Sequence, residues 1–274
     1  MNSLTTSTLA ALEEMLQNAK RNPSSDCLPV YFEKIYVGNI SRPLISAVED
    51  LLKHGSFPHI QMDITRIILK NAPPAQLSDS LRALANGLHQ LGLIPAWRNE
   101  EFAWYGSDGH EYFRVERAAF RTFGFRSQAA HINGFTSTGT LWLGRRSESK
   151  QIDPGKLDNL SAGGINANET AVHCAIRELW EEAGVPQGIA QQINPAGTLV
   201  IHRPHPPHGI HHEMLFMFDL EVPRNLVPVN HDGEVSRFIE LDLAEAAARI
   251  LADEFTDDAA LVTSDFILRR NRSS

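Results

Sequence analysis

The chain of 274 residues contains 42% hydrophobic and 21% charged residues, a balance typical of a globular protein that buries a core. Since one domain commonly takes about 150 residues, this length predicts two domains. The formal net charge of −8 argues against a nucleic-acid polymer as substrate or partner, although it permits a small anion accompanied by a metal cation.

The N-terminal segment predicts an amphipathic helix over residues 6–19, with Glu13 and Glu14 inside it. It lacks the basic region and apolar core of a signal peptide. No stretch approaches the roughly 18 apolar residues that span a bilayer. The two cysteines, Cys27 and Cys174, lie far apart in the sequence and do not suggest a disulfide framework. We therefore expect a cytoplasmic protein with reduced thiols that does not bind a membrane.

The rest of the chain before residue 115 alternates between helical and strand-like pieces. The pattern predicts a strand over residues 34–37 and helices over 44–54 and 76–91. None of these pieces carries a catalytic constellation. Residues 1–115 are therefore interpreted as a smaller α+β accessory domain that shapes the substrate site, and residues 116–274 as a second domain.

The second predicted domain is rich in strands. We expect strands over residues 129–135, 140–145, 197–203 and 213–222, followed by a helix over 243–251. One further helix, between the second and third of these strands, carries the most informative residues of the chain.

This helix lies in the segment GGINANETAVHCAIRELWEEAGV, residues 163–185. On a helical wheel the apolar side chains share one sector, namely Val172, Ile176, Leu179 and Ala183. Three glutamates gather opposite them: Glu178, Glu181 and Glu182. The pattern predicts a core face and an acidic face.

Both ends of the helix are indicated by the sequence. Asn166 and Glu169 have the spacing of a capping box before the helix. Gly184 stands where a left-handed residue often ends a helix, and Pro186 prevents continuation. These signals predict a helix of about four turns.

The acidic face requires positive charge nearby, because each pair of like charges costs a helix a few tenths of a kcal/mol. Arg177 is one source, since it shares a face with Glu181 and adjoins Glu178. A hard divalent cation is the other, because Mg²⁺ binds carboxylate oxygens and phosphate oxygens together. The alternative is a solvated acidic surface, which explains less well why the small residues Ala171 and Cys174 adjoin the carboxylates.

The segment resembles the Nudix box. Every fixed position of that motif matches: Gly163, Glu169, Arg177, Glu178, Leu179, Glu181, Glu182, Gly184 and Val185. The resemblance implies hydrolysis of a diphosphate linkage by water with Mg²⁺ or Mn²⁺, in the α/β/α sandwich with a mixed sheet that this family adopts. Such chemistry requires neutralised phosphoryl oxygens and a positioned water, which metal ions provide.

The resemblance also implies roles for individual residues. Glu178 is the implied catalytic base or a metal-bound base, and Arg177 orients it. Glu181 and Glu182 are implied metal ligands, and the carbonyl of Ala162 completes the metal shell. Because the base varies among relatives, Glu181 is also a catalytic candidate.

A narrower resemblance covers most of the chain. It rests on HINGF (131–135), LWLGRRSESK (141–150), PGKLDNLSAGG (154–164), DGEVSRF (232–238) and ALVTSDFILRR (260–270), together with WRNEEFAWYG before them. These segments resemble the Nudix branch found in plant and bacterial proteins and fused to fungal thiamin pyrophosphokinases. The implied substrate is thiamin diphosphate or, preferably, an oxidised form of it, cleaved to the monophosphate and phosphate.

Several polar residues in these segments are candidates for substrate binding. Arg145, Arg146 and Lys150 suit a diphosphate, because guanidinium forks match phosphate oxygens. The alternative for either arginine is an ion pair with a surface carboxylate. Asp158 and Asn159 either bind the substrate ring or metal-bound water, or form a turn. His131 and Asn133 either bind substrate or are core residues with satisfied hydrogen bonds.

For several other residues the sequence permits both a functional and a structural role. Glu234 is a candidate for a further metal ligand or base, or a solvated turn residue. Trp142 and Trp180 are interpreted as core or interface aromatics rather than a stacking platform. Five histidines between positions 202 and 212 match no usual zinc spacing, and the prolines among them predict a loop or lid.

Two other functions compete with a thiamin diphosphatase. One is a Nudix hydrolase of another metabolite, such as a nucleotide sugar, ADP-ribose or an oxidised nucleotide. The other is a non-catalytic ligand sensor, which the intact glutamates and the absence of a basic patch disfavour. We also expect a possible homodimer.

Overall fold

The computed structural model describes residues 4–19, 27–150, 152–204 and 209–272. Its largest element is a seven-stranded sheet with the order β11-β12-β7-β8-β13, in which β10 also pairs with β7 and β9 with β8. The strands are β7 (Ser127–Phe135), β8 (Leu141–Arg146), β9 (Leu157–Asp158), β10 (Ser161–Gly164), β11 (Asn194–Pro204), β12 (Ile210–Glu221) and β13 (Val235–Leu241). β12 runs parallel to β7 and the other pairs are antiparallel, so the sheet is mixed.

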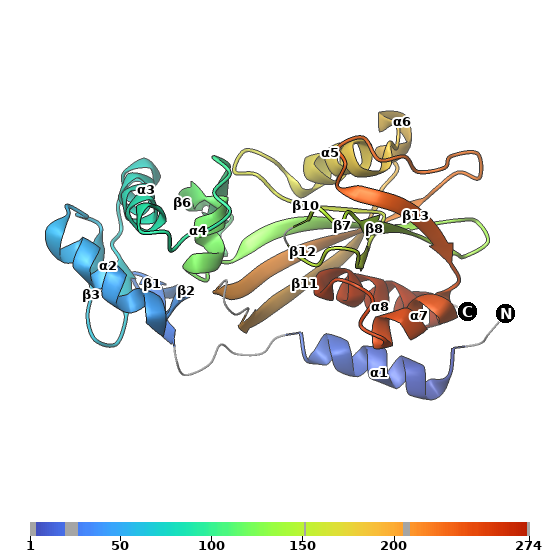
Figure 1. Ribbon diagram of the computed structural model, residues 1–274, viewed down its shortest axis with the longest axis horizontal. Helices are drawn as coiled ribbons and strands as arrows, with labels where there is room; N and C mark the ends of the chain where they lie inside the picture. The colour runs from blue at the N-terminus through green and yellow to red at the C-terminus, as the bar shows by residue number, and fades with distance from the viewer. Residues whose placement is uncertain (1–3, 20–26, 151, 205–208, 273–274) are drawn as a thin grey trace.

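Helices cover both faces of this sheet (Figure 1). α5 (Ala171–Ala183) and α6 (Gln187–Ala190) lie on one face, and α7 (Leu243–Leu251) and α8 (Asp257–Arg272) on the other. Successive side chains of β7 point to opposite faces of the sheet. Ala130 and Ile132 join the cluster beneath α5, whereas Ala129 packs with Leu261 of α8. This arrangement confirms the α/β/α sandwich with a mixed sheet.

A smaller α+β region precedes the sandwich, as predicted. Its four-stranded sheet has the order β2-β1-β4-β3, and a separate hairpin pairs β5 with β6. The elements are β1 (Cys27–Phe32), β2 (Ile35–Ser41), α2 (Arg42–His54), β3 (Ile60–Met62), β4 (Ile67–Leu69), α3 (Pro74–Gln90), β5 (Glu101–Tyr105), β6 (Glu111–Glu116) and α4 (Arg117–Thr122). One core cluster joins them from Leu28 to Phe125.

The first helix, α1 (Thr6–Gln17), packs outside this region. It lies against α7 and α8 (Figure 1), and Leu12 is buried in one cluster with Phe255 and Phe266. The boundary predicted between residues 115 and 116 falls inside β6. In the structure, α4 shares the N-terminal core, while α1 shares the core of the sandwich.

Most predicted elements are present with shifted ends, as the strand at 34–37 becomes β2 and the helix at 76–91 becomes α3. Several elements were not predicted, namely β1, β3, β4, β5, β6, α4, β9, β10, α6 and α8. β3 and β4 have three residues each, too few for a periodic pattern. α8 buries residues around much of its circumference, including Thr263 and Ser264, so it lacks a clear apolar stripe.

Cys174 of α5 is a buried free thiol. Among the described helices, none combines the length and apolar character required to cross a membrane.

Candidate active site

The glutamate-rich helix α5 begins at Ala171, two residues after the end of the predicted capping box. Its N-cap is Thr170, whose side chain accepts a hydrogen bond from the backbone N–H of His173. The Asn166 N–H donates to the Glu169 carboxylate at 3.5 Å, as in a capping box, but Asn166 is not the N-cap of α5, because that residue is Thr170. The C-terminal prediction is confirmed: Gly184 caps the helix with φ of 62°.

The predicted separation of a core face from an acidic face is confirmed only in part, since Leu179 and Ala183 are fully buried as predicted. Glu178 and Glu182 are 9% and 7% exposed, whereas Val172, predicted for the core, is 44% exposed. The physical reason is that α5 packs against β10 and β7, so the two glutamates point toward the backbone of β10. Only Glu181 of the three remains substantially open to solvent.

Burial disfavours the charged form of these carboxylates. It raises the pKa of Glu178 to about 7, although the Arg177 charge acts in the opposite direction. Burial also raises the pKa of Glu182 well above its ordinary value, and the charge of Glu178 adds to the effect. The two groups therefore favour a cation or a proton beside them.

Arg177 joins the acids of the site. Its Nε and Nη2 donate to both carboxylate oxygens of Glu169, at 2.9 and 2.8 Å. Its Nη1 donates to Glu178 at 2.6 Å and to Glu181 at 3.0 Å. Because one rigid guanidinium contacts all three acids, it fixes the orientation of Glu178, which is the role that the motif implies.

The backbone of β10 closes the other side of the two buried glutamates. The Ala162 N–H donates to Oε2 of Glu182 at 2.9 Å. A Cβ atom at Gly163 would overlap the Glu178 carboxylate, so glycine is required for this approach. The implied use of the Ala162 carbonyl as a metal ligand stays a prediction.

A turn before β13 brings further acids to α5. The Asn230 side chain donates to the Glu182 carbonyl at 3.2 Å, and the His231 N–H donates to the Glu181 carbonyl at 3.0 Å. These bonds bring Asp232 and Glu234 to Glu182, and one carboxylate oxygen from each of the three lies within 4.8 Å of the others. Asp232 was not singled out from the sequence, although its place two residues before Glu234 was a usable signal.

This donor set fits a hard divalent cation. Clustered carboxylate oxygens are the ligands of Mg²⁺, and Mn²⁺ accepts the same ligands. The raised pKa values of Glu178 and Glu182 agree with this chemistry, because a bound cation favours their charged forms.

The predicted phosphate-binding residues lie beside the acids but are engaged with protein groups. Lys150 forms an ion pair with Glu234. Arg146 pairs with Asp158 at 3.0 Å and also donates to two carbonyls of the following loop, and Arg145 donates to the Gly155 carbonyl. Arg146 therefore follows the alternative in which an arginine forms an ion pair with a carboxylate. A substrate role for these residues stays a prediction.

His131 and Asn133 lie on the opposite face of β7 from the box glutamates. His131 and Asn133 each bond to the buried Asn159 side chain, at 2.9 and 3.1 Å. The chain of hydrogen bonds continues from Asn133 through Asp219 to Arg269 of α8. The geometry favours the alternative of core residues with satisfied hydrogen bonds.

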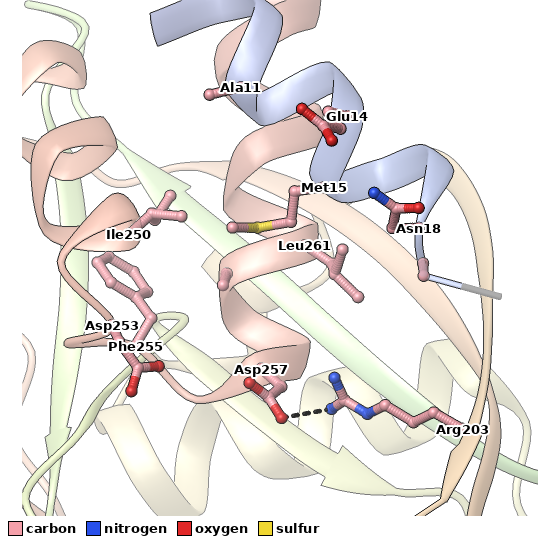
Figure 2. A pocket seen from close by; sticks show the side chains of 12 residues that line it. Ala11, Glu14, Met15, Asn18, Arg203, Ile250, Asp253, Phe255, Asp257 and Leu261 are labelled. Carbon is pink, nitrogen blue, oxygen red and sulfur yellow. Dashed lines mark ion pairs between the residues drawn. The ribbon is translucent and has the colours of Figure 1, made fainter. Parts of the chain in front are cut away.

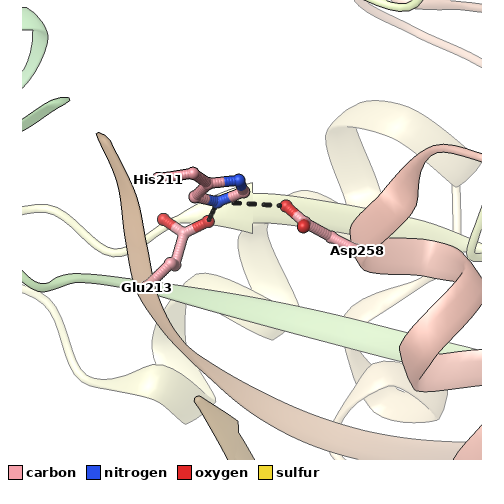
Figure 3. A group of neighbouring side chains, drawn as sticks. All are labelled: His211, Glu213 and Asp258. Carbon is pink, nitrogen blue, oxygen red and sulfur yellow. Dashed lines mark hydrogen bonds and ion pairs between the residues drawn. The ribbon is translucent and has the colours of Figure 1, made fainter. Parts of the chain in front are cut away.

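The histidine-rich segment forms a hairpin rather than the predicted loop in its described part. His202 of β11 pairs with His212 of β12, and their rings stack at 4.2 Å. His211 lies between Glu213 and Asp258, with its Nε2 at 3.1 and 3.4 Å from their carboxylate oxygens (Figure 3). His205 and His208 lie outside the described residues.

The two tryptophans occupy different environments. Trp142 is partly buried and packs against the apolar cluster beneath α5. Trp180 is 53% exposed and contacts the ring of His231 at 4.6 Å. Neither arrangement identifies a stacking platform.

A separate pocket of about 380 Å³ lies between α1 and α8 (Figure 2). Its lining combines Met15, Phe255 and Leu261 with Glu14 and an Arg203–Asp257 ion pair of 2.7 Å. It lies on the α8 side of the large sheet, whereas the box glutamates lie on the α5 side. The pocket is therefore not part of the candidate active site.

Comparison with known proteins connects this geometry to one family. The sequence pattern of the NUDIX domain matches residues 125–263. Over 250 residues the chain is 31% identical to Nudix hydrolase 24, chloroplastic, of Arabidopsis thaliana, covering 88% of this chain and 67% of the relative. It is 35% identical to Nudix hydrolase 20, chloroplastic, of the same plant, covering 70% of this chain and 53% of the relative.

One solved structure is similar to part of this chain. The crystal structure of DR0079 from Deinococcus radiodurans covers 60% of this chain and 97% of its own length, with 23% identity and a TM-score of 0.47.

Proposed function

Since this chain belongs to the Nudix hydrolase family, we propose that it cleaves the diphosphate of thiamin diphosphate or of its oxidised derivatives. Water attacks a phosphorus atom, the bridging P–O bond breaks, and the products are the monophosphate and inorganic phosphate. The convergence of Glu182, Asp232 and Glu234 beside the Arg177-bound Glu178 supports this function most directly. The five flanking segments that resemble the thiamin branch support the substrate.

Different residues bind the metal ion and accept the proton in this reaction. Glu182, Asp232 and Glu234 would hold Mg²⁺ or Mn²⁺, which supplies charge neutralisation on the phosphoryl oxygens and a lower pKa of water. Glu178, oriented by Arg177, accepts the proton of the attacking water. Its pKa of about 7 in the absence of a cation shows how strongly burial acts on this carboxylate. Glu181 is the second candidate for the base.

Location and assembly belong to the proposal as well. The cytoplasmic location and the homodimer stay predictions from the sequence. The two plant relatives carry names that describe them as chloroplastic.

The test measures phosphate release from thiamin diphosphate, oxidised thiamin diphosphate, ADP-ribose and nucleoside triphosphates, with and without Mg²⁺. We expect metal-dependent turnover, highest on an oxidised thiamin diphosphate. Glu182→Gln should lower kcat at least about 100-fold, because the buried amide removes a charged ligand. Glu49→Gln, on the exposed side of α2, is the matched control and should retain full activity.

Two results would contradict parts of this proposal. Absence of metal-dependent turnover on every compound would exclude the hydrolase activity proposed here and favour a ligand sensor. A wide preference for ADP-ribose or a nucleotide would exclude the thiamin substrate but leave diphosphate hydrolysis intact.

A further inference from the structure

Among the described residues, one group of potential metal ligands lies away from the active site. His211 and Glu213 of β12 and Asp258 of α8 each place one donor atom within 4.8 Å of the other two. Asp258 belongs to the first turn of α8, so this group lies on the α8 side of the large sheet, whereas Glu182 lies on the α5 side. The function proposed above does not use these three residues.

The backbone positions of these residues are fixed by the fold. Residues two apart on a strand point to the same face of a sheet, so His211 and Glu213 both point toward α8. His212, between them, lies beside the Tyr36 ring instead. β12 pairs with β11 on one side and with β7 on the other, and α8 places Asp258 against this interior strand (Figure 3). The three side chains therefore meet at a junction of two regular elements.

The separations between the donor atoms suit a small metal ion. Nε2 of His211 lies 3.1 Å from a carboxylate oxygen of Glu213 and 3.4 Å from one of Asp258. Two ligands of a tetrahedral zinc ion, at bond lengths of about 2.0–2.1 Å, lie about 3.3 Å apart. The two observed distances bracket this value, so Zn²⁺ fits between these atoms after small rotations of the side chains.

A proton on His211 balances the charge of the group only in part. An imidazolium offsets one of the two carboxylates, and the side chains of His211 and Glu213 are only 6% and 13% exposed. Buried charge without an opposite charge beside it is costly. A divalent cation beside neutral His211 would offset both carboxylates. In protein stripped of metal, the proton on His211 takes the place of this cation.

Nearby arginines do not supply the missing charge. Nη2 of Arg203 lies 2.7 Å from Asp257 and only 3.6 Å from Oδ1 of Asp258, so one positive charge is shared between two aspartates. Arg121 acts on Glu213 only at longer range, since no ion pair joins them among the described residues. In the same part of the chain, the buried Oδ1 atom of Asp258 has no hydrogen-bond partner. A further cation at this junction would neutralise the remaining charge.

The surroundings of the group also suit a metal site. The Ser127 hydroxyl donates to the other carboxylate oxygen of Glu213 at 2.7 Å, which orients the oxygen that faces His211. Hydrogen bonds of this kind orient the ligands of protein metal sites. The Asp258 side chain is 21% exposed, which leaves a route from solvent for an ion and for a water molecule as a fourth ligand.

We propose that His211, Glu213 and Asp258 form a second metal site, which binds Zn²⁺ and stabilises the packing of α8 on β12. One imidazole nitrogen with two carboxylate oxygens suits zinc, whereas Mg²⁺ prefers a set of oxygen ligands. The site does not depend on the proposed diphosphatase function, because it lies on the other side of the sheet from the Nudix helix.

Calorimetric titration of the metal-free full chain with Zn²⁺ tests this site. Zinc bound at the active-site acids is identified with Glu182→Gln, which removes one of them. We expect one zinc ion to bind equally well to wild type and to Glu182→Gln. In Asp258→Asn its affinity should fall at least about tenfold, because an amide replaces a charged ligand. Asp257→Asn, which changes the adjacent aspartate of the Arg203 ion pair, is the matched control and should bind zinc as wild type does.

Thermal unfolding gives a second readout that is independent of turnover. Zn²⁺ at about a hundredfold excess over Kd should raise the Tm of wild type and of Asp257→Asn by about 5 °C. It should leave the Tm of Asp258→Asn nearly unchanged. Glu213→Gln should behave as Asp258→Asn does, and the circular dichroism of each variant without zinc shows whether it is folded.

Two results would overturn the second metal site. One is equal zinc affinity in Asp258→Asn and Asp257→Asn. The other is that all zinc binding is lost in Glu182→Gln, which would place the ion at the active site. These results are separate from the diphosphatase assay, because zinc binding is measured without substrate.

Discussion

The position of Glu178 depends on the absence of a side chain at one residue of β10. Gly163 lies directly against the Glu178 carboxylate, while the neighbouring Ala162 N–H holds Glu182 at 2.9 Å. Arg177 fixes Glu178 from the other side. The carboxylate is thus held between a backbone surface and a guanidinium, and its orientation is set before a substrate binds.

Gly163→Ala tests this constraint. The added methyl would overlap the Glu178 carboxylate, so the side chain must leave its bond with Arg177 or β10 must move. We expect kcat to fall about 100-fold, comparable to a misplacement of a catalytic group by about 1 Å. The free energy of unfolding, measured in urea, should fall by about 1–3 kcal/mol.

The control for this change is Gly188→Ala in α6, where an added Cβ would meet no neighbouring atom. It should leave kcat unchanged. Equal kcat values in wild type and Gly163→Ala would contradict the proposed positioning of Glu178.

For individual residues, the sequence predicts which side chains carry the chemistry of the site better than it predicts how those side chains are oriented. The spacing of Arg177, Glu178 and Glu182 identifies the acids, because the motif depends only on residue type and separation. The helical wheel predicts the exposure of these side chains incorrectly, because it does not include the packing of β10 against α5. In the structure Glu178 is only 9% exposed, whereas Val172 is 44% exposed. Asp232 is similarly brought to the site by tertiary hydrogen bonds of the preceding Asn230 and His231.

Among the structural elements, β12 and α8 are connected by a buried ionic contact. His211 of β12 lies 3.1 Å from Glu213 and 3.4 Å from Asp258 at the start of α8 (Figure 3). Burial alone would lower the pKa of His211, and the Arg121 charge acts the same way. The charge of Asp258 and the contact with Glu213 outweigh both, so the pKa of His211 is raised. The imidazolium form therefore stabilises the packing of α8 on the sheet.

The sign of this effect determines its pH dependence. Because the folded pKa of His211 lies above its ordinary value, its contribution to stability is complete below about pH 6.5 and is lost as the pH rises through the folded pKa. We expect His211→Gln to lower the free energy of unfolding by about 3 kcal/mol at about pH 6. The difference from wild type should shrink by about pH 9.

The matched control is His110→Gln, since the His110 side chain is 81% exposed beside Asp108. Urea denaturation of this variant should match wild type at both pH values. A His211→Gln penalty that is equal at the two pH values would show that packing, and not the charge of His211, stabilises this junction.

A clear helical period made α3 predictable, whereas α8 lacks such a period and was missed. α3 alternates buried leucines with exposed polar residues, and the prediction from 76 to 91 lies close to its observed bounds, Pro74–Gln90. α8 is enclosed by α1, α7 and the sheet, so apolar residues surround much of its circumference and no stripe is visible. The sequence of α8 therefore resembles neither a surface helix nor a strand.

For the whole molecule, the chain order and the spatial order of the two regions differ. α1 precedes the N-terminal region in sequence but packs against α7 and α8 of the sandwich (Figure 1). The β5–β6 hairpin of the N-terminal region in turn forms hydrogen bonds with Ala167, in the loop between β10 and α5. A division of the chain by pattern alone cannot detect either connection, because both depend on contacts between residues distant in sequence.

Leu12→Ala tests whether α1 is an integral part of the sandwich. Leu12 is fully buried in one cluster with Phe255 and Phe266, so truncation leaves a cavity and should lower the free energy of unfolding by about 2–5 kcal/mol in urea. Leu251→Ala is the matched control, because Leu251 lies on α7 with 47% of its surface exposed, and it should cost less than about 1 kcal/mol. Near-equal costs for the two leucines would mean that α1 contributes little to the core. A large cost for Leu12 alone would mean that the sandwich depends on residues at the opposite end of the chain from α8.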